Sequence, residues 1–388
     1  MSESLVRLGW TPERDTEFEE HREEGLLPAR VAVEHRSAYV LYGEQGELQA
    51  QLAGRLRHAE IWPAVGDWVA VREPSTIAAA SLAMPPERSP DSLWRPLDPV
   101  SAKATGLTAT AIITSVLPRR TVFSRKEPWL AAKEQVLAAN ADTVFVTTAL
   151  TPTDFKPRRL ERYLATAWES GAEPAIVLTK PDLCNDVAAA VLEVEAIAFG
   201  VAVHVVNGLT GEGVPELGAY LAGNRTVALL GSSGVGKSTI VNRLAGGELM
   251  PTAEIGEDGR GRHTTRHREL IPLAGGGLVL DTPGLRELQL WDVSQGLEQS
   301  FEDVAALAEA CRFADCSHER EPGCAVRQAL RDGSLPRERF ESWRKLQREL
   351  ARLERRLDAR ARSEHSQQVR REARHRRRMQ KPPRRRIR

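Results

Sequence analysis

A glycine-rich segment near the middle of the chain carries the clearest chemistry. The sequence GSSGVGKS at residues 231–238 has the spacing GxxxxGKS and stands between an apolar strand and a helix expected to begin near Lys237. In such a loop, backbone N–H groups and the helix N-terminus surround phosphates, the lysine reaches the terminal phosphates, and the next hydroxyl coordinates Mg²⁺. The motif does not separate ATP from GTP. It predicts a nucleotide site formed by Gly231, Ser232, Ser233, Gly234, Val235, Gly236, Lys237, Ser238 and Thr239.

Two later segments extend this site toward the metal and the γ-phosphate. The sequence DTPG begins with Asp281, at the end of an apolar strand, where a carboxylate can hold Mg²⁺ through water. It ends with Gly284, whose N–H can sense the γ-phosphate. Residues 259–266 are rich in glycine and arginine, and Thr264 or Thr265 can close over the metal. The predicted magnesium ligands are Ser238 of the phosphate loop and Thr265. The alternative for residues 259–266 is an ordinary polar loop.

Base specificity is predicted by segments that precede the phosphate loop. Residues 179–182 read TKPD, and the carboxylate of Asp182 can accept both N–H donors of the guanine edge, a pairing that adenine cannot offer. The next strand ends in NGLTGE at 207–212, which resembles the short loop behind the base. Because both segments keep their usual mutual order but come before the phosphate loop, circular permutation is the simplest account. The predicted base-binding residues are Thr179, Lys180, Pro181, Asp182, Asn207 and Gly208.

Three of the four cysteines lie within fourteen residues of one another, together with a histidine. The spacing of Cys311, Cys316, His318 and Cys324 offers three thiolates and one imidazole, which make a closed tetrahedral zinc site with no position for a catalytic water. The role of such a site is structural, and a segment this small depends on the metal for its shape. The alternative is a set of reduced cysteines packed as small apolar side chains. Cys184 stands apart from the cluster.

The elements that position these residues begin with a β-rich block. Residues 1–28 are expected to be an acidic, helical extension, and residues 29–122 a small β-barrel of the OB type. Short alternating strands with glycine at the turns are predicted at residues 29–33, 39–42, 68–72 and 111–116. Residues 74–100 contain six prolines and are predicted to be a long exposed loop. Barrels of this type often bind nucleic acid, but the fold alone does not establish that function.

From about residue 128 the pattern changes to apolar strands alternating with helical stretches. Residues 128–290 are predicted to form an α/β domain with a mostly parallel sheet, whose strands are expected at residues 143–148, 175–178, 201–206, 226–230 and 278–281. Residues 295–362 are predicted to form a zinc-binding helical domain. There, an apolar stripe on a long charged helix is expected to pack on the body of the protein, with a partner groove as the alternative: Phe340, Trp343, Leu346, Leu350, Leu353 and Leu357.

Composition and charge limit the class of protein. At 388 residues, 41% hydrophobic and 28% charged, the chain is typical of a globular protein with two or three domains. Residues 1–10 lack signal-peptide features, and the most apolar long stretch, residues 188–206, is interrupted by two glutamates and a histidine. A cytoplasmic protein without a membrane partner is therefore expected, as a monomer by default.

The net charge of +1 hides a strongly basic tail, which is expected at residues 363–388. From residue 370 onward there are eleven Lys or Arg against the single acid Glu372, so this stretch carries +10 and the rest of the chain carries −9. A run of this kind can bind polyanions through phosphate neutralisation and counterion release, and RNA is the natural candidate. The alternative is a solvated tail without a specific partner.

Taken together, the permuted order of motifs resembles the ribosome small subunit-dependent GTPases, the RsgA or YjeQ family. The resemblance covers roughly residues 30–350 and rests on TKPD, NGLTGEG, GSSGVGKST, GRHTT and DTPG, followed by the cysteine and histidine cluster. It implies an OB-type N-terminal domain, a central permuted GTPase domain and a zinc domain. It also implies binding of the small ribosomal subunit and its rRNA, and hydrolysis of GTP to GDP during late subunit maturation, with release of assembly factors.

Two departures bear on mechanism. Thr179 stands where the usual motif has asparagine, and because a hydroxyl cannot reproduce the two-sided hydrogen bonding of an amide, weaker nucleotide affinity is expected. Leu285 follows Gly284, where many signalling GTPases place a glutamine that orients the attacking water. The resemblance suggests that a switch-loop histidine takes over this role, with His263 the first candidate and His267 the second.

Two other classes of function stay open at the level of sequence. In one, the chain is an RNA-binding assembly scaffold whose nucleotide site binds but barely hydrolyses. In the other, it is an ATP-using kinase or ATPase, which an ATP preference would favour.

Overall fold

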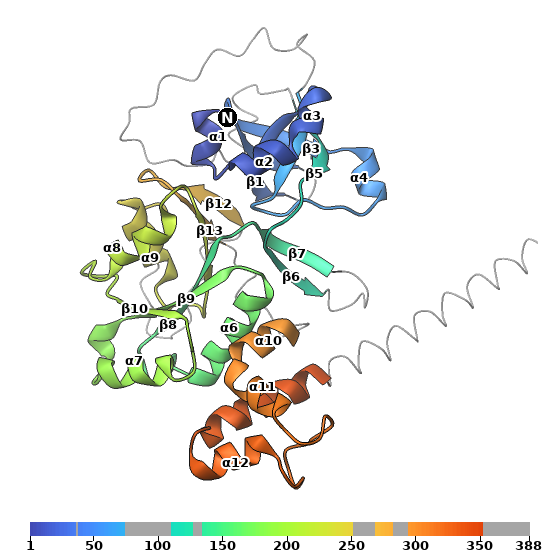
Figure 1. Cartoon of the computed structure of the whole chain (residues 1–388). Coiled ribbons are helices and arrows are strands. Elements are labelled where there is room, and N and C mark those ends of the chain that lie inside the picture. The colour runs from blue at the N-terminus through green and yellow to red at the C-terminus, as the bar shows by residue number, and fades with distance from the viewer. Residues whose placement is uncertain (36–37, 74–109, 127–133, 251–267, 282–293, 352–388) are drawn as a thin grey trace, which may run out of the picture.

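The structure is a computed structural model of the whole chain, and it describes residues 1–35, 38–73, 110–126, 134–250, 268–281 and 294–351. A β-barrel lies at one end of the molecule, an α/β sheet in the middle, and a helical region at the opposite end (Figure 1). Within the described ranges, no helix is long and apolar enough to cross a lipid bilayer.

The N-terminal barrel is formed by five strands: β1 (Leu27–Glu34), β2 (Tyr39–Gly43), β3 (Gly46–Leu52), β4 (Trp68–Arg72) and β5 (Ala111–Val116). β1 pairs with both β2 and β4, and β5 pairs with β3 in parallel and with β4 in antiparallel orientation, which closes the barrel. Buried side chains such as Val31, Leu41 and Ile113 fill its interior. The predicted OB-type barrel is confirmed. β3 was absent from the prediction although Leu48, Ala50 and Leu52 alternate there with polar residues, because the segment contains no β-branched or aromatic residue.

Short helices surround the barrel: α1 (Glu3–Arg7), α2 (Pro12–Glu17), α3 (Glu19–Glu23) and α4 (Gly54–His58). Local signals begin the first two, because the hydroxyls of Ser2 and Thr11 accept N–H hydrogen bonds in the first turn and Pro12 stands at the start of α2. The proline-rich segment, residues 74–100, lies outside the described residues.

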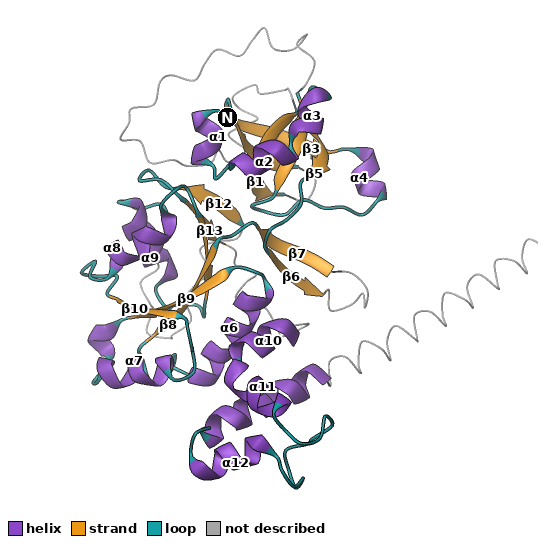
Figure 2. Cartoon of the chain, viewed as in Figure 1, coloured by secondary structure: helices purple, strands orange, loops and turns teal. Residues whose placement is uncertain are grey.

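The central sheet has the strand order β10-β9-β8-β11-β13-β12, parallel except for β12. Its strands are β8 (Thr143–Ala149), β9 (Glu173–Thr179), β10 (Ala202–Val206), β11 (Thr226–Leu230), β12 (Glu269–Pro272) and β13 (Leu278–Asp281). Figure 2 shows helices beside this sheet: α6 (Pro157–Glu169), α7 (Val187–Glu195), α8 (Val214–Gly218) and α9 (Lys237–Ala245), with 3-10 turns at Pro181–Leu183 and Ala219–Leu221. The predicted α/β fold is confirmed, and its parallel strands end at one shared edge.

The barrel and the central sheet are continuous through β1 and β12. Val33 lies opposite Glu269 in an antiparallel bridge, and the Arg268 guanidinium is 3.2 Å from the Glu34 carboxylate. A separate hairpin, β6 (Val122–Lys126) and β7 (Glu134–Ala139), lies at the same junction. The barrel and the central α/β domain therefore share one hydrogen-bonded sheet.

A buried arginine also holds this junction. Arg30 donates hydrogen bonds to the carbonyls of Leu8, Gly66 and Asn140, and its guanidinium lies 5.3 Å from the centre of the Trp68 ring. Burial lowers the pKa of Arg30 to about 10, so the side chain stays charged at neutral pH. Because the carbonyls belong to the N-terminal extension, the barrel and the chain entering β8, Arg30 joins all three.

The C-terminal helical region contains α10 (Ser294–Ser300), α11 (Glu302–Glu309), α12 (Ala325–Asp332) and a further helix over residues 337–351. In the predicted apolar stripe, Phe340 and Leu346 are buried, and Trp343 and Leu350 pack against the same cluster. Packing of the stripe on the protein body is thus confirmed for these four; Leu353 and Leu357 lie outside the described residues.

This region is attached to the central domain through α6. A Cβ on Gly296 of α10 would lie 2.0 Å from the carbonyl oxygen of Ala165, so only glycine allows the two helices this approach. Arg339 is buried and donates hydrogen bonds to the Glu161 and Asp303 carboxylates and to the Ser300 and Ile197 carbonyls. The close approach of α10 to α6 and the buried ion pair of Arg339 with Glu161 therefore hold the helical region on the central domain.

The contact at Gly296 predicts a selective loss of stability. Gly296→Ala should lower the free energy of unfolding by about 1–3 kcal/mol, because the added methyl forces α10 away from α6. Gly218→Ala is the matched control, because Gly218 ends α8 and a methyl group added there would have no heavy atom within 4 Å. Urea unfolding of both variants measures the difference, and equal stability of the two would contradict the packing argument.

Candidate nucleotide and metal sites

The phosphate loop connects β11 to α9 and is shaped by its glycines. Gly231, Gly234 and Gly236 all have positive φ. A Cβ on Gly231 would lie 2.2 Å from the carbonyl oxygen of Thr147, at the end of neighbouring β8. The sequence therefore folds locally into a loop that only glycine permits at its first position, and α9 begins immediately after it.

Lys237 lies inside this loop. Its Nζ donates hydrogen bonds to the carbonyls of Gly231, at 2.8 Å, and Ser232, at 2.5 Å, and the residue is buried. Ser238 and Thr239 follow in the first turn of α9 and are half-buried. The ammonium group is thus held by backbone carbonyls at the start of the phosphate loop, and in sites of this type the lysine reaches the terminal phosphates.

The predicted base-binding segment after β9 is bound to the phosphate loop. The Thr179 hydroxyl lies 2.6 Å from the carbonyl oxygen of Val235 and 3.3 Å from that of Thr148. Lys180, in the left-handed region at φ 56°, donates a hydrogen bond from Nζ to the Gly234 carbonyl at 2.8 Å. Thr179 is therefore a structural connection between two parts of the site, a role that its place in the motif did not indicate.

The loop after β10 meets the same edge of the sheet. Asn207 Nδ2 is 3.4 Å from an Asp182 carboxylate oxygen, and Asp182 is exposed. From α9, Arg243 donates hydrogen bonds to the carbonyls of Gly208 and Leu209. The structure therefore brings together the three segments that the sequence analysis assigned to phosphate and base, although they are separated along the chain.

Asp281 ends β13 at this edge and is buried. Glu269 of β12 lies directly opposite, and burial, followed by the charges of Asp281 and Glu47, raises the pKa of Glu269 to about 7. The remaining predicted residues of the catalytic and magnesium sites, His263, Thr264, Thr265 and Gly284, lie outside the described residues, as do His267 and Leu285.

Two side chains of α6 reach the phosphate loop and were absent from the sequence prediction. The Arg159 guanidinium donates a hydrogen bond to the Ser232 hydroxyl at 2.8 Å, and the Tyr163 hydroxyl is 3.4 Å from the same oxygen. No spacing rule connects residues 73 and 69 positions apart. Only the packing of α6 on β8 and β9, next to the strand that leads into the loop, places them there.

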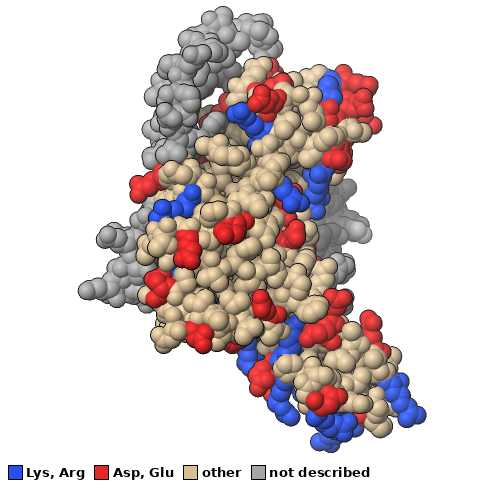
Figure 3. Space-filling view, turned by 60° about the vertical axis from the view of Figure 1, so that its left-hand side comes forward, with Lys and Arg blue, Asp and Glu red and all other residues tan. Residues whose placement is uncertain are grey.

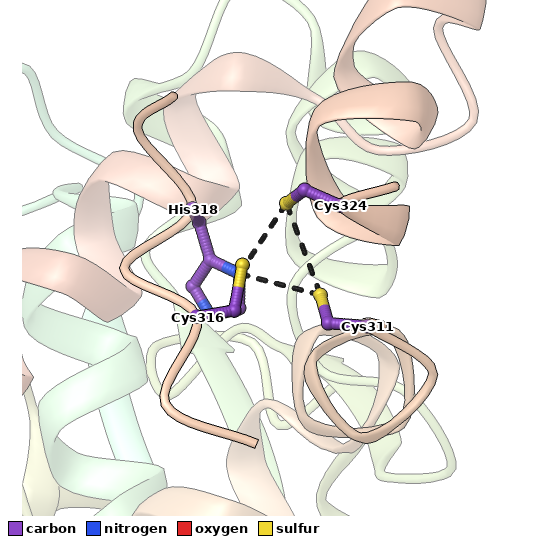
Figure 4. Close-up of side chains that lie close together, drawn as sticks. All are labelled: Cys311, Cys316, His318 and Cys324. Carbon is purple, nitrogen blue, oxygen red and sulfur yellow. Dashed lines mark hydrogen bonds between the residues drawn. The ribbon is translucent and has the colours of Figure 1, made fainter. Parts of the chain in front are cut away.

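The four predicted zinc ligands converge in the helical region (Figure 4). Their ligand atoms lie within 4.8 Å of one another. Cys311 Sγ and Cys324 Sγ are 3.8 Å apart, and His318 Nδ1 lies 3.5 Å from each. A tetrahedral zinc with bonds of about 2.3 Å to sulfur and about 2.0 Å to nitrogen would require separations of about 3.8 and 3.5 Å. The donor set and its spacing therefore fit zinc.

A glutamate outside the ligand set holds the ligand loop. The Glu321 carboxylate accepts hydrogen bonds from the Ser317 hydroxyl and from the N–H groups of Ser317, Glu319 and Arg320, which surround His318 at φ 59°. These bonds, led by the Ser317 hydroxyl, lower the pKa of Glu321 to about 2. Burial lowers the pKa of His318, which favours the neutral imidazole that a metal requires.

Comparisons with known proteins agree with this arrangement. Residues 116–291 match the family model described as RsgA GTPase. A protein of Opitutus terrae named small ribosomal subunit biogenesis GTPase RsgA is 47% identical over 361 residues, which cover 92% of each chain. A protein of the same name from Syntrophotalea carbinolica is 43% identical over 356 residues, which cover 90% of each chain.

Two solved structures share the fold. The crystal structure of YjeQ from Thermotoga maritima has a TM-score of 0.59 at 24% identity and aligns with 84% of this chain and 99% of its own. The structure of YloQ, described as a circularly permuted GTPase, has a TM-score of 0.55 at 21% identity and aligns with 84% of this chain and 95% of its own. At these identities the likeness supports the architecture alone.

The hydrogen bonds of Glu321 predict weaker metal retention when they are lost. Glu321→Ala should lower zinc affinity about 10–100-fold, because residues that orient metal ligands have effects of this size. Competition with a chromophoric chelator measures the affinity. Glu309→Ala, at the exposed end of α11, is the control; an unchanged zinc affinity in the Glu321 variant would show that the ligand loop holds its shape without this carboxylate.

Glu269 and Asp281 lie opposite each other on β12 and β13, so replacing Glu269 with a neutral residue should stabilise the protein at high pH. The pKa of Glu269 is raised in the folded state, so wild-type stability should fall as pH rises from about 4.5, the unfolded value, through about 7. Glu269→Gln should remove this loss and be up to about 3 kcal/mol more stable at pH 8. Urea unfolding of nucleotide-free protein at pH 5 and pH 8 measures it, and a pH-independent difference would refute the explanation.

Proposed function

The chain belongs to the RsgA GTPase family and is a GTP hydrolase, and we propose that it acts in the biogenesis of the small ribosomal subunit. The observation that carries the proposal is the meeting of the base-binding loops with the phosphate loop in a permuted GTPase fold. Association with the small ribosomal subunit is inferred from the names of the relatives, and contact with its rRNA from the basic tail.

We assign the nucleotide site to the residues gathered at the carboxyl edge of the sheet. The phosphate loop, residues 231–239, would bind the phosphates, with Lys237 at the terminal ones. The Asp182 carboxylate would accept the two N–H groups of guanine. Thr179 and Lys180 hold that segment against the phosphate loop, and the Asn207 amide lies beside Asp182. Pro181 and Gly208 complete the base side of the site.

Hydrolysis requires a water to attack the γ-phosphorus while the bond to the β,γ-bridging oxygen breaks, which releases GDP and phosphate. Mg²⁺, bound with GTP, would neutralise charge on the phosphates, held by Ser238 and Thr265, with Asp281 acting through water. Gly284 would donate its N–H to the γ-phosphate, and His263 would orient the attacking water. Lys237 would stabilise the charge that develops as the bond breaks.

Zinc is proposed as a structural ion in the helical region. Four protein ligands leave no open position for chemistry, and the cluster lies at the opposite end of the molecule from the barrel (Figure 1). The metal would hold α11, the ligand loop and α12 together, because Cys311 follows α11 and Cys324 precedes α12. The small core of this region therefore gains a cross-link.

Contact with rRNA is proposed through positive charge. Within residues 294–351, the described part of the helical region, six basic side chains are exposed: Arg312, Arg320, Arg331, Arg337, Lys345 and Arg348. Figure 3 shows acidic side chains between basic ones, so the described surface is not uniformly basic. The basic tail, residues 363–388, would therefore add much of the phosphate contact. Release of assembly factors on hydrolysis, a monomeric state and a cytoplasmic location complete the proposal.

A hydrolysis assay tests the proposal. The protein should hydrolyse GTP slowly, and purified small ribosomal subunits should raise the rate at least about tenfold, because the subunit would order the catalytic loop. Lys237→Ala should lower kcat about 100-fold or more, and Asp182→Ala should weaken GTP binding about 100-fold. His263→Ala should abolish the stimulation and spare nucleotide affinity.

The control is Arg225→Ala, because exposed Arg225 precedes β11 and so lies at the opposite edge of the sheet from the phosphate loop. Hydrolysis of ATP at a comparable rate would favour an ATPase instead. Binding of the subunit without multiple turnover of GTP would favour an RNA-binding scaffold. Stimulation that survives His263→Ala would remove this histidine from the mechanism.

A further inference from the structure

Helix α6 contacts the phosphate loop at one end and the C-terminal helical region along its length. At its first turn, Arg159 donates a hydrogen bond to the Ser232 hydroxyl. Farther along, Glu161 pairs with Arg339 at 3.3 Å, and both side chains are at most 4% exposed. At its last turn, the Glu169 carboxylate accepts the Gly296 N–H at 2.9 Å. A single helix therefore joins the loop to the zinc-bearing region.

Ser232 is the point at which α6 and the phosphate-loop lysine meet. Its carbonyl accepts a hydrogen bond from Lys237 Nζ, and its hydroxyl accepts one from Arg159, with Tyr163 beside it. A charged guanidinium makes a stronger hydrogen bond to a hydroxyl than a neutral donor does. Fixing the Ser232 side chain also limits its backbone, and with it the carbonyl that holds the lysine.

We propose that Arg159 is a positioning residue for GTP hydrolysis, which acts through Ser232 on Lys237 and makes the phosphate loop responsive to the packing of the C-terminal helical region on α6. GTP hydrolysis follows from membership of the family. Any use of this response when the protein is bound to a small ribosomal subunit rests on the proposed function. A helix of thirteen residues is about 20 Å long and moves as one unit. Displacement of α10 or of Arg339 therefore shifts Arg159 relative to Ser232.

The first test compares intrinsic kcat and KM for GTP without subunits. Arg159→Ala should lower kcat about tenfold while KM changes less than about threefold, because the lost contact orders the loop and does not itself bind guanine. Arg159→Lys should restore part of the rate. The neighbouring Arg158→Ala is the control, because Arg158 is exposed on the same turn.

A double-mutant cycle separates positioning from direct contact with phosphate. Ser232→Ala should lower kcat as Arg159→Ala does, and the double variant should lose no more than either single one. The proposal would be overturned if the two losses in kcat multiplied in the double variant, or if Arg159→Ala raised KM at constant kcat. It would also be overturned if Arg159→Ala and Arg158→Ala had the same kcat. Thermal melting of every variant establishes that it is folded.

Gly296→Ala tests the connection to the helical region. It should lower intrinsic kcat severalfold in the wild-type background and have little effect in the Arg159→Ala background, since the pathway is already broken there. An unchanged kcat in Gly296→Ala would overturn the connection. Wild-type assays with small subunits run in parallel, so absence of stimulation there would count against the proposed function without touching Arg159.

Discussion

The phosphate loop is held by chain segments that precede it in sequence, and the rest of the site depends on these contacts. The end of β8 approaches Gly231 so closely that only glycine fits, while Thr179 and Lys180 hold the carbonyls of Val235 and Gly234. Circular permutation is compatible with this arrangement because such contacts depend on position in the sheet and not on order along the chain. Moving the chain ends left the shared edge of parallel strands intact.

The joints between domains use buried arginine for a common physical reason. Arg30 and Arg339 each satisfy several backbone carbonyls at places where helices and strands of different domains meet. A carbonyl buried at such a joint would be costly without a partner, and the guanidinium fork supplies several donors from one side chain. Arg339 also pairs with two carboxylates, which offsets the cost of burying its charge. Arg30 thus connects the barrel to the central sheet, and Arg339 connects the helical region to α6.

The zinc-bearing region illustrates the opposite condition, a core too small to define its own loop. Its apolar cluster is built from α10 to α12 and residues 337–351, but the loop that carries His318 is exposed on either side of the ligand. Glu321 and the ligand set supply the constraints that apolar packing does not. Because α10 rests on α6, order in this region bears directly on the helix that reaches the phosphate loop.

Features confined to a short stretch of chain were determined by the sequence alone. The phosphate loop, the TKPD segment, the zinc spacing and nine of the strands are such features, because glycine, apolar runs and ligand spacing act over short stretches of chain. The short β12 and the hairpin β6–β7 were not predicted, since their pairing partners decide them. β3 was missed for another reason: its residues alternate between apolar and polar, but none of them is β-branched or aromatic. Only the tertiary structure placed Arg159 on Ser232, Thr179 on Val235 and Arg339 on Glu161, because each bond joins residues 56 to 178 positions apart and no local pattern records such a distance.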